Sequence, residues 1–157
     1  MSRVINFSIQ SNTHCGYAGT NSAYVTDYYL NINNISDVPV QATLYLYTKD
    51  GNQFTEPAIN DLSFIGIDAD IVPGTPFTIN ANSTVQYNNY FGNQNATQSY
   101  LSCDMRPAYG KIVVHSSSGI LMATGEVVGR RHFFADNIPQ WVSLNRVPIT
   151  INSGLQF

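Results

Sequence analysis

The pattern that most restricts the fold of this chain is the alternation of apolar and polar residues at every second position. In residues 3–10, RVINFSIQ, the apolar residues Ile5, Phe7 and Ile9 are separated by polar ones. Side chains of a β-strand point to its two faces in turn, whereas a helix needs apolar residues three or four positions apart. This segment is therefore predicted to be a half-buried strand, and almost no segment of the chain has the period of a helix.

Further strands are predicted where Tyr, Val, Thr, Ile and Leu gather between turn residues. They fall in residues 23–36, 38–54, 76–92 and 109–131, with a C-terminal pair in 141–151. The turns NISDVP, KDGN, NANS and SSSG contain Asn, Asp and Gly, which favour positive φ, and Pro39 belongs at a strand's start or edge because it lacks a backbone donor. Residues 56–76, 93–107 and 130–140 are predicted to be irregular.

Roughly eight to ten short strands at regular intervals indicate an all-β fold, an antiparallel β-sandwich or jelly-roll-like single domain. We expect residues 1–20 to form an N-terminal extension, a strand followed by a linker, and residues 21–157 to form the sandwich. A chain of 157 residues can bury a core of its own without disulfides.

The low charge restricts the partners. Charged residues make up 11% of the chain, against about 25% in an average soluble domain. An uncharged polar surface repels its copies weakly and is best tolerated where packing against neighbours is intended or harmless. With seven Lys and Arg and a net charge of −3, the chain has no basic field for phosphates, so we expect no nucleic-acid partner.

No apolar run is long enough for a secretory leader or a membrane span. We expect synthesis in the cytoplasm and a final place at the surface of a cell, spore or particle, reached by another route such as lysis.

Three stretches follow a recurring pattern: YYLNINNISDVPVQATLYLYTKDGNQ, FTINANSTVQYNNYF and YGKIVVHSSSGILMATGEV. The pattern resembles small bacterial β-sandwich proteins of the sensory rhodopsin transducer type and surface proteins of spore-forming bacteria. It covers roughly residues 24–128, and its motifs specify strands and turns. The resemblance implies the sandwich fold and brings no catalytic residue with it; the N-terminal extension and the long inserted loops depart from the transducer type.

Two cysteines, Cys15 and Cys103, are the only ones in the chain. Three arrangements stay open: a bridge within the chain, a bridge between subunits, and a buried reduced pair. If Cys15 links subunits, the alternating strand of Ile5, Phe7 and Ile9 is suited to add to the sheet edge of another subunit.

Aromatic residues suggest a second kind of site. Ten tyrosines and Trp141 offer stacking surfaces for a sugar, for which Tyr90, Tyr100 and Trp141 are the candidates. Packing across strands is the plainer explanation for such residues.

Metal and catalytic sites have weaker signals. Asp61, Asp68 and Asp70 lie in one predicted loop and are a weak calcium candidate, without the regular ligand spacing of an EF-hand. The histidines and cysteines have no zinc-ligand spacing, and no nucleophile motif is present. We therefore expect no cofactor and no enzymatic activity.

Together these patterns predict a non-enzymatic structural subunit. It would assemble with copies of itself into a filament, fibre or layer through its N-terminal strand and sheet edges, and disulfides could link the subunits. The alternative is a carbohydrate- or small-ligand-binding module of the same fold.

Overall fold

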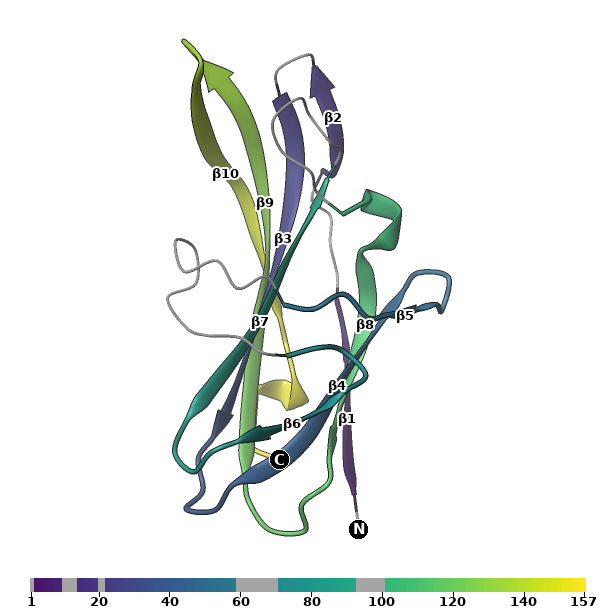
Figure 1. Ribbon diagram of the computed structural model, residues 1–157, viewed down its shortest axis with the longest axis vertical. Helices are drawn as coiled ribbons and strands as arrows, with labels where there is room; N and C mark the ends of the chain where they lie inside the picture. The colour runs from purple at the N-terminus through teal and green to yellow at the C-terminus, as the bar shows by residue number, and fades with distance from the viewer. Residues whose placement is uncertain (1, 10–13, 20–21, 59–70, 93–100) are drawn as a thin grey trace.

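The structure, a computed structural model, describes residues 2–9, 14–19, 22–58, 71–92 and 101–157. Within them it has ten strands and two single-turn 3₁₀ helices (Figure 1). The strands are β1 (Arg3–Ser8), β2 (Gly16–Gly19), β3 (Ser22–Asn34), β4 (Val40–Thr48), β5 (Gln53–Phe54), β6 (Pro76–Ile79), β7 (Thr84–Gly92), β8 (Pro107–Val114), β9 (Leu121–Ala135) and β10 (Ile138–Ile149). The 3₁₀ helices are η1 (Cys103–Met105) and η2 (Asn152–Gly154).

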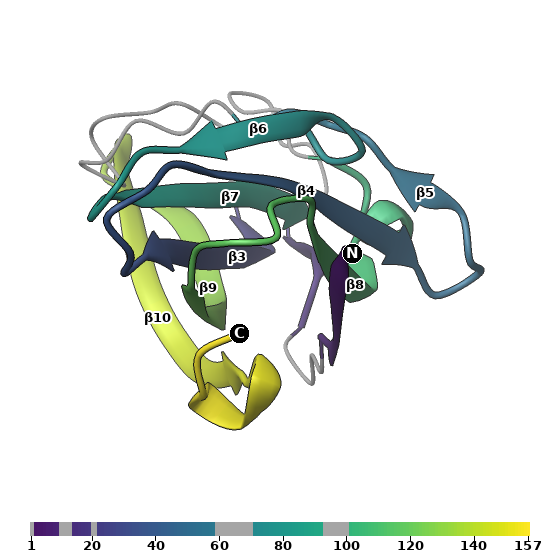
Figure 2. The same cartoon turned by 90° about the horizontal axis from the view of Figure 1, so that it is seen from below.

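The strands form two antiparallel sheets that face each other (Figure 2). The first sheet has the order β1-β8-β4-β5, and β6 also pairs with β4. The second has the order β10-β9-β3-β2, and β7 also pairs with β3. The predicted all-β sandwich is confirmed.

The chain changes sheets at the turns that the sequence marks. Strand β3 belongs to the second sheet and β4 to the first, and the same change of sheet separates β6 from β7 and β8 from β9. Asn, Gly and Pro specify a reversal of the chain, but they do not specify whether the next strand pairs beside the last one or crosses to the facing sheet. The consecutive strands predicted at these turns are present, but they do not pair with each other.

The side chain of Asn34 stabilises the loop in which the chain passes from β3 in one sheet to β4 in the other. Its buried side-chain amide donates to the carbonyl oxygens of Val38 (2.7 Å), Asn80 (3.0 Å) and Ile79 (3.1 Å). Its Oδ1 accepts from the hydroxyl and the backbone N–H of Ser36, at 2.6 and 3.0 Å. The Asn and Ser of the predicted turn NISDVP are thus structural: they join two loops at one end of the sandwich.

The C-terminal third differs from the expectation. Residues 130–140 are not irregular, because β9 and β10 form one long hairpin whose turn residues, Asp136 and Asn137, have φ of 53° and 63°. Two consecutive positive φ values are typical of a type I′ turn, which suits the twist of paired strands. The predicted C-terminal strand pair in 141–151 is also wrong: β10 is a single strand with a bulge between Ser143 and Asn145.

The core lies between the sheets. Its largest fully buried side chains are Tyr28, Tyr87, Phe91, Leu30, Ile32, Leu44, Leu46, Ile71, Ile79, Ile112, Leu121 and Ile149. The C-terminal segment closes one open side, where Phe157 exchanges two backbone hydrogen bonds with Leu121 at 2.7 and 2.8 Å (Figure 2). In the described part of the chain, no helix is long and apolar enough to cross a membrane.

Candidate functional site

Cys15 and Cys103 form a disulfide with each other. The bridge connects the segment between β1 and β2 to the first residue of η1, with the two Cα atoms 5.7 Å apart. Of the three arrangements that the sequence left open, the structure has the bridge within the chain. Neither cysteine is free to bridge to a second subunit in this state.

The predicted N-terminal strand is present and alternates as expected. Phe7 and Ile9 are buried in the core, and Ile5 is half-buried against it. The strand does not pair with another subunit here: β1 is antiparallel to β8 of its own chain, with Ile5 opposite Ile112. The segment expected to be an extension thus supplies an edge strand of the sandwich.

Among the described strands, six pair with one sheet neighbour only: β1, β2, β5, β6, β7 and β10. Strand β10 is the longest of these edges and carries three exposed apolar side chains, Ile138 (59%), Val142 (45%) and Leu144 (48%). In Figure 1, the end of the β9–β10 hairpin extends beyond the strands of the first sheet. Ile138 and Val142 lie on the core-facing side of their sheet, at an end where no strand of the first sheet faces them.

The aromatic candidates do not form one platform. Tyr90 lies opposite Asp27 on β3, and Trp141 lies opposite His132 on β9 and stacks on its ring, with centroids 4.3 Å apart. Both point to the outer face of the second sheet, but they lie on strands at opposite sides of it. At the usual strand spacing and rise they are about 20 Å apart, too far for one sugar ring. Tyr100 lies outside the described residues.

A polar network occupies the middle of this outer face. Arg130 Nε lies 2.6 Å from Oδ2 of Asp27, and its Nη2 donates to the Tyr29 hydroxyl at 2.8 Å. The Tyr29 hydroxyl in turn donates to Oδ2 of Asp27 at 3.3 Å. Asp27 is 1% exposed, and burial raises its pKa to about 6 although Arg130 and Tyr29 lower it. Burial and the neighbouring Asp27 raise the pKa of Tyr29 to about 12.

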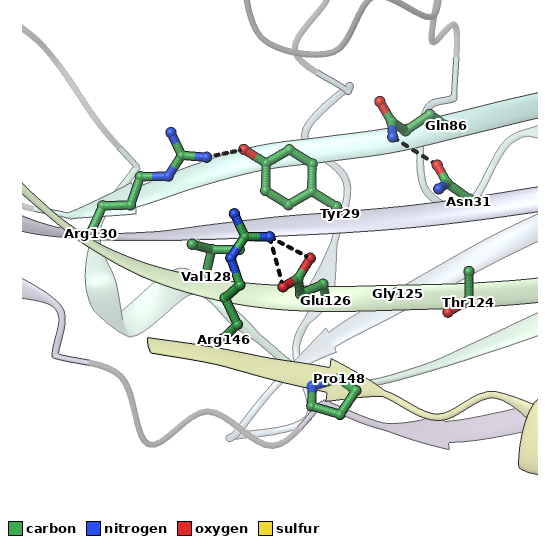
Figure 3. Close-up of a pocket in the computed structure, with 10 residues that line it drawn as sticks. All are labelled: Tyr29, Asn31, Gln86, Thr124, Gly125, Glu126, Val128, Arg130, Arg146 and Pro148. Atoms are coloured by element: carbon green, nitrogen blue, oxygen red, sulfur yellow. Dashed lines mark hydrogen bonds and ion pairs between the residues drawn. The ribbon is translucent and has the colours of Figure 1, made fainter. Parts of the chain in front are cut away.

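Beside this network lies a cavity of about 530 Å³. Figure 3 shows its ten lining residues: Tyr29, Asn31, Gln86, Thr124, Gly125, Glu126, Val128, Arg130, Arg146 and Pro148. In it, Gln86 Nε2 donates to Asn31 Oδ1 at 2.7 Å, and Arg146 Nη1 donates to Glu126 Oε1 at 3.1 Å.

This site is not recognisable in the sequence, because its residues look like the exposed side of a strand. Polar residues at every second position of β3 are typical of a solvent face. Yet three apolar residues share this face: Ala23 and Val25 on β3 and Val128 on β9. They are buried, although they do not belong to the core that lies between the two sheets. Apolar residues at these outward-facing strand positions are the signal in the sequence that could have indicated a partly covered outer face.

Asp61, Asp68 and Asp70, the calcium candidates, lie outside the described residues. Within the described ranges, no group of three or more His, Cys, Asp or Glu side chains is arranged to hold a metal ion.

Comparison with protein families, curated proteins and solved structures gives no match for this chain. The resemblance to the transducer type and to spore-surface proteins therefore stays a prediction.

Proposed function

We propose that the protein is a non-enzymatic structural subunit that associates with copies of itself through the open edges of its sheets. The observation that carries this proposal is the exposed end of β10, where Ile138, Val142 and Leu144 are 59%, 45% and 48% exposed. An edge strand with unpaired backbone groups and apolar side chains is a template for pairing with another chain.

The contact with a second copy has two components. Apolar side chains of the hairpin end, Ile138 and Val142, would be covered by the same surface of the partner, as in an isologous contact. The backbone of β10 would pair over a short stretch only, because a bulge follows Ser143 and a proline follows Ile138. Such edge features limit uncontrolled pairing and favour one register.

A second open edge allows growth beyond a dimer. Strand β1 is unpaired on its outer side among the described strands, and its Val4 is 49% exposed. Two different contacts on each subunit are the minimum for a filament, fibre or layer. Because the cysteines are joined within the chain, we propose that these contacts are non-covalent. The low charge of the chain supports close packing at the surface of a cell, spore or particle.

Light scattering after size exclusion, over a range of protein concentrations, tests the proposal, and electron microscopy shows the form of any assembly. Val142→Lys puts a charge into the β10 contact and is expected to lower the mass of the assemblies. Val4→Lys is expected to shorten polymers and leave the β10 contact intact. Met105→Lys, at an apolar residue of η1 that is 40% exposed and lies in neither β1 nor β10, is the matched control and is expected to change nothing. A monodisperse monomer at all concentrations would refute the proposal.

A further inference from the structure

We propose that the cavity on the outer face of the second sheet is a binding site for a neutral polyhydroxylated ligand, a sugar. Its volume of about 530 Å³ lies within the range of small-molecule sites, roughly 300–1,000 Å³. It is formed by side chains of four adjacent strands, β7, β3, β9 and β10, which fix their positions (Figure 3). This inference does not rest on self-association, because the cavity and the exposed end of β10 involve different residues.

The charges of the cavity favour a neutral ligand. Arg146 is paired with Glu126 at 3.1 Å, and Arg130 is paired with Asp27 at 2.6 Å. An anionic ligand would have to compete with a carboxylate for either arginine, and a cation would have to compete with an arginine for either carboxylate. The formal charges of these four side chains cancel, so the cavity attracts neither an anionic nor a cationic ligand electrostatically.

The hydrogen-bonding groups favour hydroxyls. Gln86 is 8% exposed and uses its Nε2 on Asn31, while its Oε1 is buried without a hydrogen-bond partner. A buried acceptor that lacks a donor costs about 1–3 kcal/mol, and a rotation of the Gln86 side chain would bring its Oε1 to a ligand hydroxyl that supplies the donor. Thr124 adds an exposed hydroxyl on the adjoining part of the lining.

Apolar surface lies among these polar groups. Val128, Pro148 and the ring of Tyr29 also line the cavity (Figure 3). A sugar ring has an apolar C–H face and a rim of hydroxyls, and it suits a lining in which apolar and uncharged polar groups alternate.

The test is an array of neutral and acidic glycans, followed by calorimetric titration of the neutral glycan that gives the strongest signal. Thr124→Trp fills the cavity from an exposed position and is expected to lower the affinity at least about tenfold. Thr84→Trp is the matched control, since Thr84 is an exposed residue of β7 on the same face and outside the lining. Gln86→Met removes the buried acceptor and is also expected to weaken binding about tenfold.

Three results would overturn the proposal: no binding to any neutral glycan, binding to acidic glycans alone, or an affinity that Thr124→Trp leaves unchanged. Thermal unfolding of each tryptophan variant shows that it is folded. The affinity of Gln86→Met is compared with the affinities of these two variants and does not decide the test alone. Trp141→Ala separates this cavity from the aromatic site predicted from the sequence, because Trp141 is not among the lining residues. Its affinity is expected to equal that of the unaltered protein.

Discussion

The ring of Phe7 on β1 lies over the backbone of Gly110 on β8. A Cβ atom at Gly110 would stand 2.5 Å from Phe7 Cζ and 3.0 Å from Leu46 Cδ2. Real Cβ atoms do not come that close to carbon neighbours, so the glycine is required by the space that Phe7 takes. This contact explains how an edge strand buries an aromatic side chain almost completely.

Gly110→Ala is therefore expected to destabilise the fold by about 1–3 kcal/mol, because the added methyl group overpacks the core. Urea unfolding measures the change. Phe7→Leu removes the ring atoms that the methyl group would meet, so the double variant should lose less stability than the two single losses together. Strictly additive losses would show that Phe7 and Gly110 are not in contact.

Asn34→Ala is expected to cost about 2–3 kcal/mol, because the carbonyl oxygens of Val38, Ile79 and Asn80 lose a shared donor. The neighbouring Asn33→Ala is the control. Asn33 accepts one hydrogen bond, from the exposed Thr84 hydroxyl. Losing this bond should lower the free energy of unfolding by well under half of the amount expected for Asn34→Ala. Equal losses in the two variants would contradict the role given to Asn34. Chemical unfolding of both variants at the same pH makes the comparison.

Asp27 is expected to make stability depend on pH. Its pKa is raised from 3.8 to about 6 in the folded protein, so folding favours the protonated form. Its contribution to stability is fully present below about pH 4 and is lost as the pH rises through 6, a change of about 3 kcal/mol at most. Unfolding free energies at pH 4 to 7 test this.

Asp27→Asn should remove that part of the pH dependence. Glu126→Gln, which alters the more exposed ion pair with Arg146, should leave it in place. Identical pH profiles for Asp27→Asn and the unaltered protein would show that Asp27 titrates normally.

Reduction of the disulfide is expected to lower the free energy of unfolding by about 4–5 kcal/mol, because Cys15 and Cys103 are 88 residues apart and close a long loop in the unfolded chain. Unfolding with and without reductant measures the loss, and the double variant Cys15→Ser, Cys103→Ser should reproduce it. Non-reducing gels provide the second readout: a band of dimer or higher mass that reductant removes would mean that the cysteines link subunits.

The strands were predictable because their signal is local. Alternation in residues 3–10 and the turn residues of NANS or KDGN depend on neighbours in the sequence. The pairing was not, since the choice between sheets depends on distant contacts such as those of Asn34 with Ile79 and Asn80. The turn at Asp136 and Asn137 was within reach, because two residues that tolerate positive φ stand side by side there.

The cavity was much less predictable. Its ten lining residues come from four strands, which meet through the register of β3 with β7 and β9 and of β9 with β10. Asn31, Gln86 and Thr124 are ordinary strand residues when taken singly. Neither a motif nor a spacing connects them.

The Cys15–Cys103 bridge also determines how this sandwich would carry mechanical load. A pull between Arg3 and Phe157 would pass from Cys15 straight to Cys103 through the sulfur atoms, so the residues between the cysteines would bear no tension. Strands β2 to β7 lie in that bypassed part of the chain, and only β1, β8, β9 and β10 would be drawn out. Such a subunit would extend only by the length of the chain outside the two cysteines. The disulfide would then stop further extension, with more than half of the chain still unstretched.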